Sequence, residues 1–119
     1  MGVLTGKFED GRSVPSGDVR AGPAGWQGYF DAGRPRAELA GQMATVRELL
    51  TVGGRTLAQG ALCWLLAKGP MILTIPGART AVQATENAAA MAFGPLPGSV
   101  MEEIETILQR PAKGPPRPR

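Results

Sequence analysis

The sequence predicts an α/β chain that is mostly helical and contains about one short strand. Three segments repeat apolar residues at the spacing of a helix and a fourth begins with a helix-capping pattern, whereas residues 71–75 form one short run that is apolar except at Thr74. Gly and Pro supply 17 and 11 of the 119 residues, so much of the remainder must be loop. A lone strand has no pairing partner in its own chain. We therefore expect either a part of a larger fold or an unusual, mostly helical domain.

The first predicted helix follows a long, glycine-rich loop. Residues 1–33 show neither a strand period nor a helix period, and so long a stretch without regular structure is typically functional or disordered. The next segment, residues 36–52, is predicted to be a helix that ends at the glycine pair 53–54. Its apolar face comprises Leu39, Met43, Val46 and Leu50.

Residues 56–68 form the second predicted helix, and a short strand follows it. Thr56 is suited to cap this helix, and Gly69-Pro70 stops it. The expected core stripe comprises Leu57, Ala61, Trp64 and Leu65, widened by Leu62, Cys63 and Leu66. Residues 71–75 are predicted to be a strand that is apolar on both faces, as in a parallel sheet covered by helices.

Capping patterns predict two further helices. Thr80 with Gln83, and Ser99 with Glu102, each fit the capping box, in which a hydroxyl is followed three residues later by Glu or Gln. The first pair starts a helix over residues 80–92. The second starts a helix whose apolar stripe comprises Met101, Ile104, Ile107 and Leu108. We expect residues 1–108 to form one domain, which the resemblance given below makes a partial one, and residues 109–119 to form a disordered, basic, Pro-rich tail.

Residue counts exclude several kinds of site. The sequence has no histidine, which rules out histidine metal ligands, Ser-His and Cys-His nucleophiles and imidazole acid–base chemistry within these residues, and we expect no metal site. Cys63 is the single cysteine, so no internal disulfide can form. No apolar run approaches the roughly 18 residues of a membrane span, and no signal-peptide pattern begins the sequence. We expect a cytoplasmic protein without a membrane partner.

The net charge of +3 originates in the tail. Residues 109–119 contain no acid and four basic residues, which are Arg110, Lys113, Arg117 and Arg119. Because this excess does not belong to a folded face, nucleic acid is a poorly supported partner.

The sharpest candidate site is the turn between the predicted strand and the third helix. Gly77 lets the backbone approach a ligand, and the following helix N-terminus attracts anions. Arg79 would add a guanidinium suited to phosphate, while Gln83 and Asn87 share its helix face and Glu86 lies beside them. This arrangement predicts an anion site followed by polar groups for the sugar and base of a nucleotide. A turn glycine, a helix cap and a solvated face would explain the same residues, and the spacing alone favours that simpler explanation.

A weaker candidate lies at residues 2–7, where glycines flank Thr5 and Lys7 and permit close approach to a phosphate. The upstream glycine spacing of a Walker motif is missing, so the segment alone favours the simpler explanation, a flexible N-terminus. Tyr29 has no nearby Lys or His to tune it as a proton donor, and Cys63 is expected in the core.

Taken together, three segments resemble the aldo-keto reductase family. GVLTGKF near the start, TLAQGALCWLLAKGP in the middle and ILTIPGARTAVQATEN near the end match, in that order, the last quarter to third of the family's chain. The resemblance covers roughly residues 2–108. It implies the C-terminal fragment of a TIM (β/α)8 barrel, which as a whole needs about 250 residues. MILTI would be the eighth strand, and GVLTGK would follow the seventh.

The resemblance also implies NADP(H) as the cofactor. The loops after the seventh and eighth strands bind phosphate in many such barrels, which agrees with both candidate sites. The family pattern places Leu4, Lys7 and Arg20 along or near the pyrophosphate. It places Gly77 and Arg79 at the adenosine 2′-phosphate, and Gln83, Glu86 and Asn87 at the adenine and ribose. A 2′-phosphate site favours NADP over NAD.

The catalytic residues of the family are not found here. Its tetrad of Asp, Tyr, Lys and His lies on earlier strands, so no catalytic residue can be assigned in this sequence. We therefore expect the cofactor-binding part of an NADP-dependent aldo-keto reductase that reduces aldehydes or ketones, inactive by itself. Its expected partners are the nicotinamide cofactor and an N-terminal half-barrel. The alternative is a small, non-enzymatic helical module that self-associates through residues 71–75.

Overall fold

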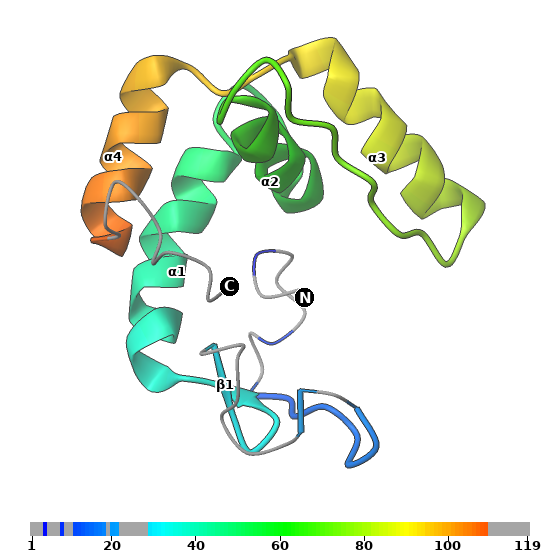
Figure 1. Cartoon of the computed structure of the whole chain (residues 1–119), viewed down its shortest axis with the longest axis vertical. Helices are drawn as coiled ribbons and strands as arrows, with labels where there is room; N and C mark the ends of the chain where they lie inside the picture. Colours follow the sequence, from blue (N-terminus) through cyan, green and yellow to red (C-terminus); the bar gives the residue numbers. More distant parts are fainter. Residues whose placement is uncertain (1–3, 5–7, 9–10, 19, 22–28, 110–119) are drawn as a thin grey trace, which may run out of the picture.

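The computed structural model describes residues 4, 8, 11–18, 20–21 and 29–109 (Figure 1). In this part of the chain a hairpin precedes four helices, which confirms the predicted helical character. The elements are β1 (Phe30–Asp31), β2 (Arg34–Pro35), α1 (Ala37–Leu50), α2 (Leu57–Leu66), α3 (Ala81–Phe93) and α4 (Gly98–Leu108).

A tight turn joins β1 to β2. Phe30 pairs with Pro35, and Asp31 pairs with Arg34, in antiparallel register. Ala32 and Gly33, between the strands, have φ values of 45° and 78°, the left-handed backbone that a two-residue hairpin turn requires. Strands of two residues are too short to produce an alternating pattern, which is why the sequence did not predict them.

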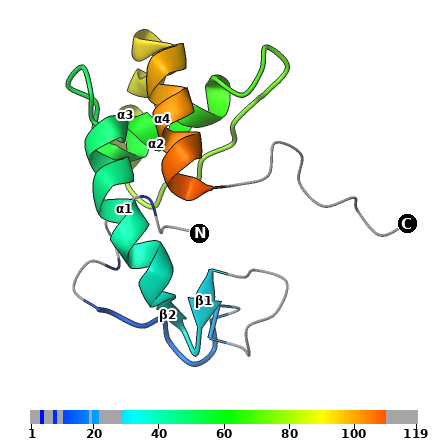
Figure 2. The same ribbon diagram turned by 90° about the vertical axis from the view of Figure 1, so that its left-hand side faces the viewer.

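Helix α1 buries the face that the sequence predicts. Met43, Val46 and Leu50 are at most 3% exposed, and Leu39 packs against them. The Gln42 side chain donates a hydrogen bond from Nε2 to the carbonyl oxygen of Ile107 in α4, over 3.1 Å. This bond ties together two helices that lie side by side in Figure 2.

Helix α2 buries much of the predicted stripe, because Cys63 is fully buried and Leu57, Leu62 and Trp64 pack against the core. Its buried residues are Gln59, Gly60 and Cys63, whereas Leu65, which belongs to the predicted stripe, is 39% exposed. The close approach of α1 explains why the face of α2 that carries Gly60 is buried. A Cβ atom placed on Gly60 would lie 2.1 Å from the carbonyl oxygen of Leu50, so only a residue without a side chain fits at that contact.

Two of the three predicted helix caps are confirmed. The hydroxyls of Thr56 and Thr80 each accept a hydrogen bond from the backbone N–H three residues later, at the starts of α2 and α3. The predicted Ser99 cap is wrong. Helix α4 has Pro97 as its N-cap residue, without a side-chain capping bond, and therefore holds Ser99 inside its first turn.

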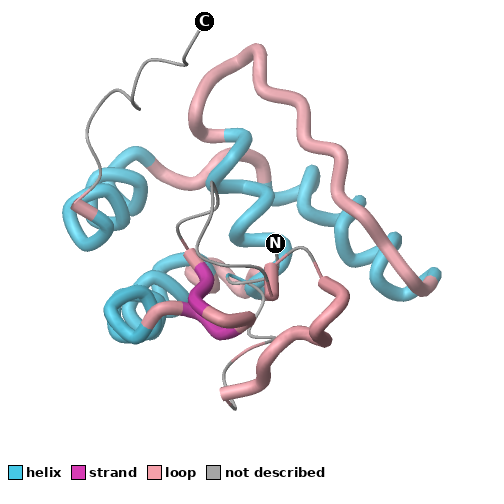
Figure 3. The backbone as a smooth tube through the Cα atoms, turned by 60° about the horizontal axis from the view of Figure 1, so that its bottom comes forward, coloured by secondary structure: helices cyan, strands magenta, loops and turns pink. Residues whose placement is uncertain are grey.

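The strand predicted over residues 71–75 is also wrong. This segment belongs to the extended connection between α2 and α3, which Figure 3 shows running beside α3. Met71, Leu73 and Ile75 are 93%, 84% and 90% exposed. Among the described residues the only sheet is the β1–β2 hairpin, so this segment has no neighbouring strand to complete a ladder.

The main core lies among the helices. A smaller cluster joins Phe8, Val14 and Phe30, in which the two phenyl rings meet edge to face with their centroids 5.3 Å apart. The main cluster comprises Met43, Val46, Leu50, Cys63, Ala90, Leu96 and Ile104. It fixes α3 against α2, and this packing positions the site described next.

Candidate functional site

A pocket of about 620 Å³ opens where α2 and α3 both begin. We call it the helix-end pocket. It is bordered by the first turn of α2, by the end of the extended connection and by the polar face of α3. Its lining residues are Thr56, Leu57, Ala58, Gly77, Arg79, Gln83, Glu86 and Asn87. The structure thus brings together five of the eight residues that the sequence singled out.

Two amide side chains of α3 hold the turn that enters the helix. The backbone N–H of Arg79 donates to Oε1 of Gln83 over 2.8 Å. Nδ2 of Asn87 donates to the carbonyl oxygen of Gly77 over 3.3 Å. The turn from Gly77 to Arg79 is therefore tied to α3 at both of its ends, which limits where the Arg79 guanidinium can reach.

A third amide side chain, that of Gln59, ties α2 to α3. Its Oε1 accepts a hydrogen bond from the backbone N–H of Thr56 over 3.0 Å, and the backbone N–H of Gln59 donates to the Thr56 hydroxyl over 3.2 Å, which completes a capping box. Its Nε2 donates to the carbonyl oxygen of Glu86 over 3.1 Å. Gln59 is 8% exposed, and these bonds satisfy its buried amide.

The charges of the helix-end pocket suit a ligand with both an anionic group and hydroxyls. Arg79 is exposed and Glu86 is half-buried. The first turns of α2 and α3 both face the pocket, and a helix N-terminus carries partial positive charge and N–H groups without intrahelical acceptors. An anion is therefore favoured near Arg79, while the Glu86 carboxylate can accept hydrogen bonds from hydroxyl groups.

The space next to Gly77, where a side chain would lie, is open. A Cβ atom added to this residue would meet no atom within 4 Å, and Gly77 itself is exposed. A ligand can therefore approach the backbone of the turn without displacing any neighbour.

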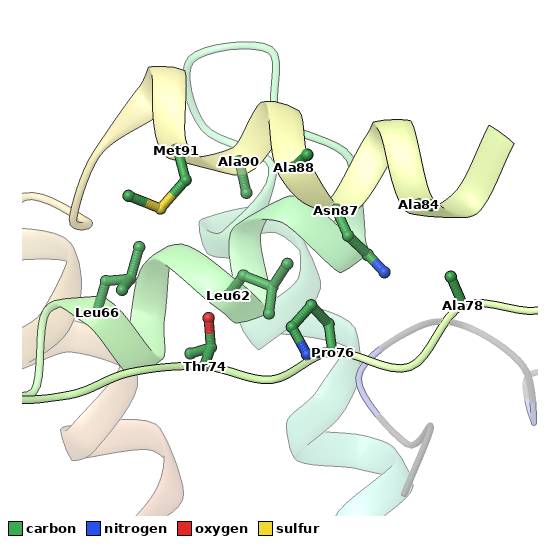
Figure 4. A pocket seen from close by; sticks show the side chains of 10 residues that line it. All are labelled: Leu62, Leu66, Thr74, Pro76, Ala78, Ala84, Asn87, Ala88, Ala90 and Met91. Carbon is green, nitrogen blue, oxygen red and sulfur yellow. The ribbon is translucent and has the colours of Figure 1, made fainter. Parts of the chain in front are cut away.

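A second, more apolar pocket of about 280 Å³ lies between α2, α3 and the extended connection (Figure 4). In Figure 4 the Asn87 side chain extends from α3 toward the connection that carries Pro76 and Ala78. Asn87 therefore borders both pockets. The remaining lining residues are Leu62, Leu66, Thr74, Ala84, Ala88, Ala90 and Met91.

Arg20 is not in the helix-end pocket. Its guanidinium pairs with the Asp18 carboxylate through Nε, over 2.7 Å, and through Nη2, and it lies 5.6 Å from the ring centroid of Phe8 and 5.8 Å from that of Phe30. The hydrogen bonds with Asp18 raise the pKa of Arg20 above its ordinary value. The structure thus places this cation beside the small aromatic cluster.

Of the other two N-terminal candidates, only Leu4 is among the described residues, and it does not line the pocket. Leu4 packs against the main core cluster, and Lys7 lies outside the described residues. Cys63 is fully buried, as predicted, and its thiol donates to the carbonyl oxygen of Ala90 over 3.6 Å. Tyr29 is about half exposed.

Sequence reasoning missed the contribution of α2 to the helix-end pocket. Thr56, Leu57 and Ala58 form one of its walls. The sequence did contain a signal, because a cap at Thr56 places a second helix N-terminus in the fold. Nothing in the spacing of residues 56–58 and 77–87 indicated that the two helix starts would lie together.

Comparison with known proteins gives one match. The family model described as the aldo/keto reductase family matches residues 1–109. Neither the curated proteins nor the solved structures gave a match. Within the described part of the chain, no helix is both long enough and apolar enough to cross a membrane. Residues 4, 8, 11–18, 20–21 and 29–109 contain no group of three or more Cys, Asp or Glu that could hold a metal ion.

Proposed function

The chain belongs to the aldo/keto reductase family, and we propose that its helix-end pocket holds the adenosine end of NADP(H). The observation that carries this proposal is the convergence of Gly77, Arg79, Gln83, Glu86 and Asn87 around one pocket. The family resemblance assigns these same residues to the adenosine 2′-phosphate, ribose and adenine. A scattered arrangement would have left only the simpler explanation, a solvated helix face.

The residues fit a phosphate ester. Arg79 lies next to the N-cap of α3, where the helix dipole and a guanidinium act on an anion in the same direction. The open space above Gly77 admits the phosphate oxygens close to the backbone. A 2′-phosphate carries two negative charges near neutral pH, so these features favour NADP over NAD.

The remaining polar residues have separable roles in this proposal. The Glu86 carboxylate would accept hydrogen bonds from ribose or from the adenine amino group. Gln83 and Asn87 act first on the protein, because their amides bond to the backbone of residues 79 and 77. Their contact with the nucleotide would involve the hydrogen-bonding capacity that these bonds leave over.

We assign these residues to cofactor anchoring and not to the chemical step. The family's tetrad includes a histidine, and the 119 residues contain none. In this proposal other segments of an aldo-keto reductase barrel supply the tetrad and reduce the carbonyl with hydride from the bound nicotinamide. The exposed side chains of Met71, Leu73 and Ile75 would then contact those other segments.

Titration of the full chain with NADPH and NADH, followed by nucleotide fluorescence, tests the proposal. Replacing Arg79 with Ala should weaken NADPH binding by about 10- to 100-fold, the worth of a hydrogen bond to a charged group, and should change NADH binding little. Arg34→Ala is the matched control, because it removes an exposed arginine of β2 that does not line the pocket. Equal NADPH affinity in the Arg79→Ala and unmodified chains would end the proposal.

A self-associating helical module is the second candidate function. The observation in its favour is the exposure of Met71, Leu73 and Ile75 in an extended segment. Large exposed apolar side chains in a row are typical of interaction surfaces. The two functions differ in what covers these side chains: other strands of one barrel, or a second copy of the chain.

A further inference from the structure

We infer that Gln59, which lines neither pocket, is a positioning residue that sets the distance between the two walls of the helix-end pocket. The inference rests on the proposed cofactor function and concerns how that site is held in shape. Gln59 joins the capping box of α2 on one side and the backbone of α3 on the other. Its amide therefore bridges the two helix starts that border the pocket.

The bridge reaches the turn through α3. The Gln59 amide fixes the carbonyl of Glu86, and the next residue, Asn87, holds the carbonyl of Gly77. One turn earlier in α3, Gln83 holds the N–H of Arg79. A displacement of α3 relative to α2 would therefore carry Glu86, Asn87 and the Arg79 turn together, away from the wall formed by residues 56–58.

The burial of Gln59 makes the loss of its hydrogen bond to Glu86 costly. Gln59 is 8% exposed, and a buried amide that loses a partner has no water to replace it. The helices also pack closely on either side, since α2 and α3 share the core that includes Cys63 and Ala90. The position of Gln59 is thus determined by packing as well as by its hydrogen bonds.

Two variants separate the bridge from the cap. Gln59→Glu keeps a side-chain oxygen for the Thr56 N–H but replaces the donor to the Glu86 carbonyl with an acceptor, so that two oxygens face each other. Thr56→Ala removes the hydroxyl of the capping box and leaves the bond between Gln59 and Glu86. If Gln59 acts by positioning α3, the first variant should affect the pocket more than the second.

Cys63→Ala is the matched control for packing. Cys63 lies one turn after Gln59 on the same buried face of α2, and its thiol donates to Ala90, one turn after Glu86. The two contacts therefore join the same helices by the same kind of bond, and only one of them lies beside the pocket.

The test measures binding of adenosine 2′,5′-bisphosphate and of 5′-AMP to the full chain by calorimetry, at a temperature where circular dichroism shows every variant folded. Gln59→Glu should weaken the bisphosphate about tenfold and 5′-AMP less, because 5′-AMP loses only contacts with Glu86 and Asn87, whereas the bisphosphate also loses its contact with Arg79. Cys63→Ala should stay within about twofold of the unmodified chain for both ligands. Thr56 lines the pocket, so Thr56→Ala is compared by the ratio of the two affinities, which should stay unchanged. A uniform loss of folded protein would lower both affinities in proportion and leave their ratio unchanged.

Amide hydrogen exchange gives a readout without ligand. Gln59→Glu should speed exchange over residues 77–83, and Cys63→Ala should not. Bisphosphate binding by the unmodified chain with an unchanged affinity ratio in Gln59→Glu overturns the inference alone. Absence of bisphosphate binding by the unmodified chain overturns the proposed function and this inference with it.

Discussion

The Asn87 side chain donates a hydrogen bond to the carbonyl oxygen of Gly77, ten residues earlier in the chain. This bond closes the turn that leads into α3 onto the helix itself. Together with the bond from the Arg79 N–H to Gln83, it defines the entrance of the helix-end pocket. These two hydrogen bonds therefore hold the backbone of the turn that carries Arg79.

Replacing Asn87 with Leu should loosen this turn. The substitution removes the donor to Gly77 and keeps a similar volume, so we expect NADPH affinity to fall about fivefold, the equivalent of about 1 kcal/mol for one partly exposed hydrogen bond. Fluorescence titration measures the effect. Thr85→Leu, an exposed change on α3 outside both pockets, is the control and should bind as the unmodified chain does. Unchanged affinity in Asn87→Leu would show that the turn needs no brace.

Gly60→Ala should destabilise the fold. Its added Cβ would lie 2.1 Å from the Leu50 carbonyl oxygen, a backbone atom that cannot rotate away, and we expect a loss of about 1–3 kcal/mol in the free energy of unfolding. Gly41→Ala on α1 is the control, because an added Cβ there meets nothing within 4 Å. It should stabilise the helix by about 0.5–1 kcal/mol. Urea unfolding followed by circular dichroism compares them, and a stable Gly60→Ala chain would contradict this account of helix packing.

The two hydroxyls at the starts of α2 and α4 should differ in their contribution to stability. Thr56→Ala removes an observed cap and should lower the free energy of unfolding by about 1 kcal/mol. Ser99→Ala removes a hydroxyl that caps nothing, and should change it by less than about 0.5 kcal/mol. Thermal unfolding of the two variants measures how much stability each substitution removes. A larger loss of stability in Ser99→Ala than in Thr56→Ala would show that Ser99 caps α4, as the sequence predicted.

Charges on the extended connection should reduce self-association without unfolding the chain. Leu73 and Ile75 are 84% and 90% exposed, so replacing both with Lys removes little buried surface. We expect thermal stability to stay within about 0.5 kcal/mol of the original and any oligomer to dissociate. Light scattering across a concentration series gives the result. An oligomer that survives the double substitution would place the contact elsewhere.

The sequence predicted those features that depend on local patterns. The stripe of α1 and the caps at Thr56 and Thr80 follow from spacing within one helix, and all are found in the structure. The burial of Gly60 on α2 could not be predicted in this way, because it is decided by the backbone of Leu50, which contacts Gly60. Partners distant in the sequence determine which of several apolar faces is covered.

The candidate site likewise has one part that local sequence patterns predict and another part that they do not. Gly77, Arg79 and the polar face of α3 are continuous in the sequence, so their proximity was predictable from helix geometry. The wall from α2 was missed because it depends on how two helices cross. Arg20 was placed near the pyrophosphate by the family resemblance alone, and this stays a prediction; the structure shows Arg20 paired with Asp18, a residue only two positions away.

The contact between Gly60 and Leu50 has a consequence for comparing relatives. Because the obstructing atom belongs to the backbone, no compensating change at position 50 can make room for a larger residue at position 60. A homologue with valine or leucine there must hold its first and second helices farther apart. Its core between these two helices would then be packed differently although every residue lining the helix-end pocket is identical, so alignments of the pocket residues alone would overlook the difference.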